Sequence, residues 1–271
     1  MNTSFSSVEK VYNNGTVHRF HTNVPYITVD NFPKLGKLAA MRFLEWVNAN
    51  PEGVISLPTG KTPEYFIQWV RLALEKWNSE EGKRMREDNG LYIDRKPDLG
   101  ALRFVQIDEF YPIDPRQHNS FYNYVQKYYI QGFGLDPARG QFINCDEIPL
   151  DGGRAFCEVF PDGKVDLGLR YREPKSRVEE IQQKSIFMID DWCAGYEQRI
   201  RDMGGIGFFL GGIGPDGHIA FNTRGSDPHS TTRLTHTNFE TQAAAAGDLG
   251  GIEVSRTKPV ITIGLDTITH Y

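Results

Sequence analysis

The sequence has few cysteines, no long hydrophobic run and no excess of positive charge. Its three widely spaced cysteines, Cys145, Cys157 and Cys193, form no CxxC pair or Cys/His cluster, so we predict no metal site and reduced thiols in a cytoplasmic protein. No window approaches 18 consecutive apolar residues, and Met1 to Val11 lacks the apolar core of a signal peptide. We therefore expect no membrane association.

The charge balance limits the partners. The formal net charge of −5 argues against nucleic acid as a partner. It leaves an anionic small ligand open, because such a ligand responds to local rather than net charge.

The composition and the pattern of apolar residues indicate an α/β protein. The 271 residues are 39% hydrophobic, which suits one large α/β domain or two small ones with a substantial core. Residues 1–22 are polar and are predicted to form a loose arm, and 23–271 the folded domain. Apolar runs and helical periodicities alternate along that domain. The predicted strands are 24–29, 54–57, 102–107, 141–144, 206–210 and 260–263, and the predicted helices are 35–47 (capped by Asp30 or Asn31), 63–76, 120–129 and 178–203.

This alternation predicts β-α-β units and a mostly parallel sheet flanked by helices. Polar segments follow three of the strands, at 58–63, 108–109 and 211–218, so we expect them at one edge of the sheet. The segment around Pro161-Asp162-Gly163 reads instead as a β-hairpin over 155–171, inserted at about 150–175. The inserted hairpin is predicted to be a partner contact or a lid.

A strand that turns into a helix at Thr59-Gly60-Lys61-Thr62 indicates an anion site. Free backbone N–H groups, the positive end of the helix dipole, two hydroxyls and a lysine would surround the anion. The alternative interpretation is a simple helix cap, with Thr62-Pro63 as N-cap and first helical residue. The glycine spacing is not that of a Walker loop.

Two further segments carry groups suited to proton transfer. Asp108 and Glu109 at a strand end would face opposite ways, and a desolvated Asp108 could abstract a carbon-bound proton, although a capping role is the plainer interpretation. Asp216 and His218 lie in Gly-Pro-Asp-Gly-His after an apolar strand, where a carboxylate can orient an imidazole as a proton shuttle.

Cations and hydroxyls recur late in the chain. Arg233 follows three hydroxyl residues, and Lys258 follows Arg256-Thr257. Arginine binds phosphate in bidentate fashion, but each of these cations alone could be ordinary surface charge.

Together these segments resemble the glucosamine-6-phosphate deaminase/isomerase family, within the superfamily that includes 6-phosphogluconolactonase and sugar-binding regulators. They occur in the family's order over about 30–268, and the Gly-rich segment is the most specific. The segments that resemble the family are Leu57-Pro58-Thr59-Gly60-Lys61-Thr62-Pro63, Ile107-Asp108-Glu109-Phe110, Gly211 to Asn222, Ser230-Thr231-Thr232-Arg233 and Lys258 with the strand after it.

The resemblance implies a modified Rossmann-like fold without a cofactor. It also implies conversion of glucosamine 6-phosphate and water to fructose 6-phosphate and ammonia. Asp108 would move a proton between C2 and C1, and His218, supported by Asp216, would open the sugar ring. The phosphate would be surrounded by Thr59, Gly60, Lys61, Thr62, Arg233 and Lys258.

The sequence departs from the family in three places. Thr223 stands where the family has the Glu that partners the ring-opening His, and Lys61 replaces a small residue. The family continues beyond the strand after Lys258, so the resemblance implies a shortened C-terminal end or a piece of a longer protein. Thr223 leaves three functions open: the deaminase, a related sugar-phosphate isomerase or lactonase, and a non-catalytic sugar-phosphate sensor. A homo-oligomer also stays open.

Overall fold

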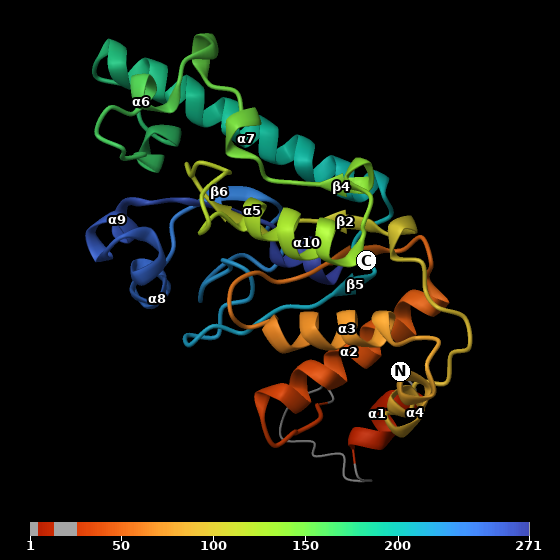
Figure 1. The fold of residues 1–271 in the computed structure, drawn as a ribbon. Helices are drawn as coiled ribbons and strands as arrows, with labels where there is room; N and C mark the ends of the chain where they lie inside the picture. The colour runs from red at the N-terminus through yellow and green to blue at the C-terminus, as the bar shows by residue number, and fades with distance from the viewer. Residues whose placement is uncertain (1–4, 14–25, 271) are drawn as a thin grey trace. The chain divides into compact units, whose positions relative to one another are not determined.

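The computed structural model describes residues 5–13 and 26–270, which fall into two compact units. Unit 1 comprises the described residues up to Gly53 together with Thr59–Leu102 and Tyr128–Pro137. Unit 2 comprises Val54–Pro58, Arg103–Lys127 and the chain from Ala138 onward. Figure 1 labels the elements of both units, and each unit is described by itself.

Unit 1 is helical. Asn31 caps α2 (Phe32–Ala49) by accepting a hydrogen bond from the Lys34 N–H at 2.9 Å, which confirms one of the two predicted caps. An added Cβ at Gly36 of α2 would lie 2.4 Å from the Cβ of Tyr65, so this glycine permits the close approach of α3. Within the predicted loose arm, a capped helix forms instead. The helices that lie wholly in unit 1 are α1 (Ser7–Tyr12), α2, α3 (Glu64–Glu75), α4 (Glu80–Asp88) and η1 (Leu99–Ala101).

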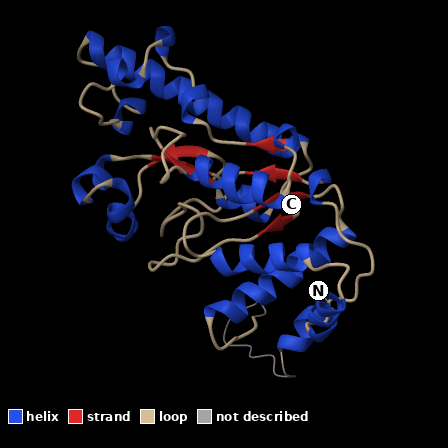
Figure 2. Cartoon of the chain, viewed as in Figure 1, coloured by secondary structure: helices blue, strands red, loops and turns tan. Residues whose placement is uncertain are grey.

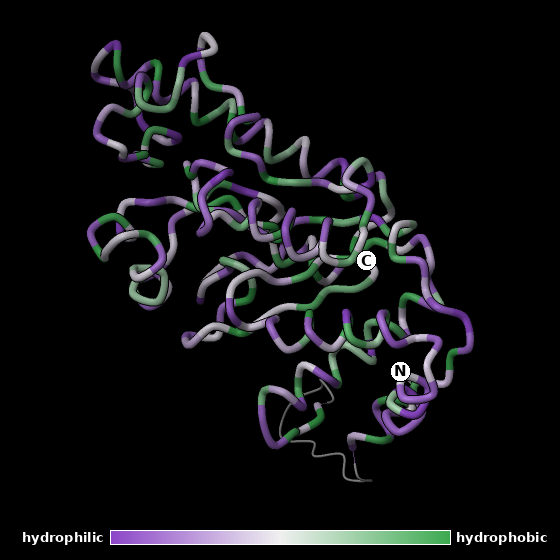
Figure 3. Tube along the Cα trace, in the orientation of Figure 1, coloured by the Kyte–Doolittle hydropathy of each residue, from purple (hydrophilic) through white to green (hydrophobic). Residues whose placement is uncertain are grey.

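Unit 2 contains the predicted parallel sheet. Its four strands run in the order β4-β2-β1-β5, and each neighbouring pair is parallel. All three residues of β1 are buried, as expected for a strand covered on both faces. Figure 2 shows the strands among the helices, and Figure 3 shows hydrophobic residues along the chain in this sheet region. The strands are β1 (Val54–Ser56), β2 (Arg103–Val105), β4 (Gly140–Gln141) and β5 (Phe208–Phe209).

Unit 2 also contains a three-stranded antiparallel sheet that the sequence did not predict. Its order is β3-β7-β6, with β3 (Asp108–Phe110), β6 (Arg233–Thr235) and β7 (Val260–Thr262). Asp108 and Glu109 are therefore strand residues rather than part of a loop at the rim of the parallel sheet. Short strands of mixed polarity carry little periodicity, and only their pairing with the apolar β7 identifies them.

The long helix α7 (Arg177–Asp202) packs against both sheets of unit 2, and Ser176 caps its N-terminus. It buries Ile186, Ile189 and Ile200, and the Tyr196 hydroxyl on the same helix donates to the Gln106 carbonyl at 2.8 Å. The helix is thereby fixed to the chain between β2 and β3. The remaining helices are α5 (Phe121–Val125), a π-helix (Gln126–Gln131), α6 (Phe156–Val159), α8 (Phe239–Leu249), α9 (Ile252–Thr257), α10 (Leu265–Thr269) and the 3-10 turns η3 (Pro137–Arg139), η4 (Cys145–Glu147), η5 (Asp151–Gly153) and η6 (Leu167–Arg170).

The predicted hairpin at 155–171 is wrong. The segment forms α6, a turn and η6, which lie along α7 (Figure 1). Phe156, Val159 and Phe160 follow the i, i+3, i+4 spacing of a helix rather than the alternation of a strand. Gln182 on α7 donates to the Val159 carbonyl at 3.0 Å, so the segment packs on the helix instead of pairing with itself.

One further strand prediction is contradicted in its described part. Tyr26–Val29 has no strand structure, and the first two residues of the predicted strand lie outside the described residues. Within 5–13 and 26–270, no helix is both long and apolar enough to cross a membrane.

Candidate functional site

Asp108 and Glu109 point to opposite faces of β3 and have different surroundings. The Glu109 carboxylate accepts from the Ser120 hydroxyl at 2.8 Å and from the Tyr122 N–H at 2.7 Å, so it caps α5. The Asp108 carboxylate receives no hydrogen bond from any described residue. Burial, with Glu109 as a smaller cause, raises the pKa of Asp108 to about 8. Asp108 is therefore the carboxylate of this pair that is free to act as a base.

A row of three residues crosses the antiparallel sheet. Thr262 on β7 lies directly opposite Asp108 on one side and Arg233 on the other. Directly opposite residues of antiparallel strands project from the same face. The Thr262 hydroxyl accepts a hydrogen bond from the Phe221 N–H at 3.1 Å, so the chain that follows His218 lies on this face as well. The sheet thus gathers Asp108, Arg233 and the His218 segment.

His218 is held by its Nδ1 atom. Nδ1 lies 2.5 Å from Asp216 Oδ1, which fixes the hydrogen on Nδ1 and leaves the lone pair on Nε2. Nε2 has no hydrogen-bond partner in the described part of the chain. An added Cβ at Gly214 would lie 2.0 Å from the His218 Cε1 atom, so this glycine makes room for the ring. The predicted carboxylate–imidazole pair is present, with an unoccupied nitrogen for proton transfer.

The first turn of α8 closes this pair into a ring of hydrogen bonds. The Asn238 side-chain amide donates to Asp216 Oδ2 at 2.5 Å, while its oxygen accepts from the Thr241 N–H at 3.1 Å. The Thr241 hydroxyl lies 3.2 Å from His218 Nδ1. Burial raises the pKa of Asp216, but the hydrogen bonds from Asn238 and His218 outweigh it and the net shift is downward. We call these four residues the α8 clamp.

Sequence reasoning missed Asn238, Thr241 and Thr262. Asn238 before Phe239-Glu240 is an ordinary N-cap signal. Nothing in the sequence indicates that the amide of this cap reaches a carboxylate 22 residues upstream.

Arg233 is a half-buried cation without a carboxylate partner among residues 5–13 and 26–270. Its guanidinium makes long hydrogen bonds of 3.3 Å to the Thr231 carbonyl and 3.4 Å to the Ser226 hydroxyl. Burial lowers the pKa of the guanidinium, and Asp227 opposes that shift. A desolvated guanidinium with free donors favours an anionic ligand.

The Thr59–Thr62 loop belongs to unit 1. Gly60 has a φ of +81°, and α3 begins at Glu64 with Pro63 as its N-cap residue and no side-chain hydrogen bond to its first turn. The predicted N-cap at Thr62 is therefore wrong, because Pro63 occupies that position, and the anion site at this loop stays a prediction. Because Arg233 lies in unit 2, a phosphate site shared by the two stays a prediction.

Lys258 lies apart from the row formed by Asp108, Thr262 and Arg233. It precedes Thr262 by four extended residues, roughly 14 Å along the strand direction at about 3.4 Å per residue. Its Nζ donates to the Pro112 carbonyl at 2.7 Å. The structure thus does not bring Lys258 together with Arg233.

The fold is α/β, and the side chains of Asp108 and His218 are chemically suited to proton transfer. No protein-family model matches the chain. Its sequence is 26% identical over 242 residues to a glucosamine-6-phosphate deaminase of Bacillus velezensis, covering 89% of this chain and 76% of that protein. It is 45% identical to a glucosamine-6-phosphate deaminase of Caenorhabditis elegans over 76 residues, a match that spans 28% of each protein.

Solved structures show the same fold. A monomeric glucosamine-6-phosphate deaminase matches with a TM-score of 0.61 and 21% identity, over 89% of this chain and 76% of that one. A 6-phosphogluconolactonase from Plasmodium vivax matches with a TM-score of 0.53 and 16% identity, over 97% and 78%. The resemblance predicted from the sequence and the α/β fold class are both confirmed.

Proposed function

We propose that this chain converts glucosamine 6-phosphate and water to fructose 6-phosphate and ammonia. The observation that carries the proposal is the placement of a desolvated Asp108 on the same sheet face as the segment after His218. The relatives named glucosamine-6-phosphate deaminase support the substrate.

The two groups have different tasks in this reaction. His218 Nε2 would carry a proton between the ring oxygen and the C1 hydroxyl and so open the pyranose ring. Asp108 would then take the C2 proton and return it at C1, converting the amino aldose to a ketose imine that water hydrolyses to ammonia. Asp216 keeps the imidazole in the form that leaves Nε2 free.

Ammonia release by the purified protein tests the proposal. Glucosamine 6-phosphate should yield fructose 6-phosphate and ammonia in equal amounts, measured by coupled assays for each product. If the protein binds the sugar phosphate but forms neither product, the deaminase proposal fails and the sensor takes its place.

A lactonase is the second candidate. The α8 clamp holds His218 without any contribution from the side chain of Thr223, so the imidazole is positioned even where the family's Glu is absent. Hydrolysis of a sugar-phosphate lactone needs such an imidazole but no base at C2. Turnover of 6-phosphogluconolactone without ammonia release would favour this candidate.

Arg233→Ala is expected to raise the KM for glucosamine 6-phosphate by ~10–100-fold with a smaller change in kcat. The reason is that hydrogen bonds to a charged group contribute about 1.5–3 kcal/mol. Binding of unphosphorylated glucosamine should change little. Arg224→Ala, at an exposed arginine in the same segment, is the matched control. Equal weakening of both sugars by Arg233→Ala would remove Arg233 from the phosphate site.

Asn238→Ala is expected to lower kcat by about 10-fold while KM stays unchanged, because Asp216 loses one hydrogen bond worth ~1–1.5 kcal/mol. The substitution also removes a helix cap, which costs about 1 kcal/mol of stability. Asn31→Ala removes the corresponding cap of α2 and serves as the control for that effect. A kcat that falls equally in both variants would show a stability effect only.

A further inference from the structure

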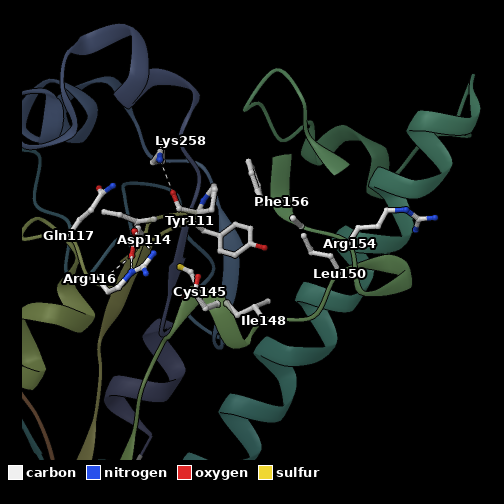
Figure 4. A pocket seen from close by; sticks show the side chains of 14 residues that line it. Tyr111, Asp114, Arg116, Gln117, Cys145, Ile148, Leu150, Arg154, Phe156 and Lys258 are labelled. Carbon is white, nitrogen blue, oxygen red and sulfur yellow. Dashed lines mark hydrogen bonds and ion pairs between the residues drawn. The ribbon is translucent and has the colours of Figure 1, made fainter. Parts of the chain in front are cut away.

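A cavity lies in unit 2, apart from the row formed by Asp108, Thr262 and Arg233. It has a volume of about 500 Å³, within the range of small-molecule sites. Its walls come from the chain after β3, from the chain between η4 and α6, and from Lys258 before β7 (Figure 4). None of the residues assigned above to proton transfer lines it.

Lys258 is the uncompensated charge of this cavity. Its ammonium donates to the neutral Pro112 carbonyl at 2.7 Å, and no described carboxylate lies within ion-pair distance. Burial lowers its pKa, although Cys145 and Glu109 act in the opposite direction. Two of the three ammonium hydrogens are therefore available to a ligand.

The other cations on the walls are already paired. Arg116 binds Asp114 through two hydrogen bonds of 2.8 and 2.9 Å, and Arg154 binds Asp151 at 2.7 Å. The exposed Asp146 also lines the cavity and adds negative charge. Lys258 is thus the unpaired cation among the described wall residues, and Asp146 lies on the same walls. Such a cavity favours a ligand with one negative charge over a phosphate monoester with two.

The opposite wall is apolar. Tyr111 and Phe156 meet edge to face with ring centroids 5.9 Å apart, and the side chains of Ile148 and Leu150 continue this surface (Figure 4). Such a wall accommodates a flat or branched hydrocarbon body. The Cys145 thiol also lines the cavity, and burial raises its pKa to about 12, so the thiol stays protonated near neutral pH.

From this arrangement we infer that the cavity binds a small monocarboxylate with an aromatic or branched aliphatic body. The carboxylate lies at the Lys258 ammonium, and the hydrocarbon body lies against Tyr111 and Phe156. This site is independent of the proposed deaminase reaction and of its phosphate ligands.

Phenylacetate is a suitable probe, and phenylacetamide is its neutral counterpart. A ligand of this size is expected to bind with a dissociation constant on the order of 1 mM, measured by ligand-observed NMR. Phenylacetamide should bind at least about 10-fold more weakly, because it cannot form the ion pair. Equal binding of the two compounds, or no binding of phenylacetate at 10-fold higher concentration (about 10 mM), would overturn the proposal.

Lys258→Met should weaken phenylacetate at least about 10-fold, whereas Lys258→Arg should retain most of the binding. Lys164→Met, at an exposed lysine outside the cavity, is the matched control. His218→Asn should leave phenylacetate binding unchanged, and displacement of phenylacetate by glucosamine 6-phosphate would place the probe in the sugar site instead.

A second measurement does not depend on the folding of a Lys258 variant. In the unsubstituted protein, nuclear Overhauser contacts should join the phenylacetate ring to the rings of Tyr111 and Phe156. Phenylacetamide at the same concentration should give no such contacts. Contacts of bound phenylacetate with other aromatic side chains only would place the probe elsewhere and refute the assignment.

Discussion

Asp108→Asn is expected to lower the kcat for ammonia release by ~10²–10⁴-fold with little change in substrate affinity. Asparagine keeps the shape of the side chain but cannot accept the C2 proton, and general base catalysis contributes a factor of this size. Exchange of the C2 hydrogen with deuterium oxide, followed by NMR, should stop in the same variant. Asp248→Asn, at an exposed position on α8, is the matched control.

The same variant separates the candidate functions. A lactonase would keep its activity in Asp108→Asn, because opening a lactone needs no base at C2. Retained ammonia release in Asp108→Asn would contradict the assignment of this carboxylate as the base.

Asp108 should also leave a signature in the pH dependence. A base with a pKa of about 8 is active only when deprotonated, so kcat/KM should rise with pH up to about 8.

The raised pKa of Asp108 should also affect stability, because the free energy of unfolding should fall as pH rises. Between the ordinary carboxyl pKa near 4 and the raised value, the folded protein holds a proton that the unfolded chain has lost. The contribution of Asp108 to stability therefore falls as pH rises over this interval, and Asp108→Asn should reduce that slope in denaturant titrations.

His218→Asn is the second variant with a large expected effect, a decrease in kcat of ~10²–10⁴-fold. The variant removes Nε2 as the carrier of the ring-opening proton, while Asp108 and Arg233 remain in place on the sheet. His229→Asn, at an exposed histidine beyond the same segment, is the matched control.

The substrate form distinguishes the two catalytic roles. Fructose 6-phosphate is partly open-chain in solution, so exchange of its C1 hydrogen should suffer less in His218→Asn than ammonia release from glucosamine 6-phosphate. In Asp108→Asn both should fail together. An equal loss of both reactions in His218→Asn would show that the imidazole acts after ring opening or only supports the fold.

The sequence alone determined the α/β class and most of the long elements. The apolar strand at Val54–Ser56 and the periodic helix at Arg177–Asp202 carry strong local signals, because burial on both faces and a 3.6-residue period each leave a distinct pattern. The Asp216–His218 pair was also predictable, since the two residues are neighbours in one glycine-rich turn. The resemblance to the glucosamine-6-phosphate deaminase/isomerase family rests on the order of such segments.

Only the tertiary structure decided what surrounds these groups. Asp108 and Arg233 share a face because both pair with Thr262, a contact between segments more than a hundred residues apart along the chain in the first case. Asn238 contacts Asp216 because the N-terminus of α8 lies beside that carboxylate. Lys258 contacts the Pro112 carbonyl instead of Arg233, because it lies four extended residues before Thr262. The segment at 155–171 became helical because its apolar residues pack on α7. Each of these outcomes depends on long-range pairing and burial, which short polar segments do not encode locally.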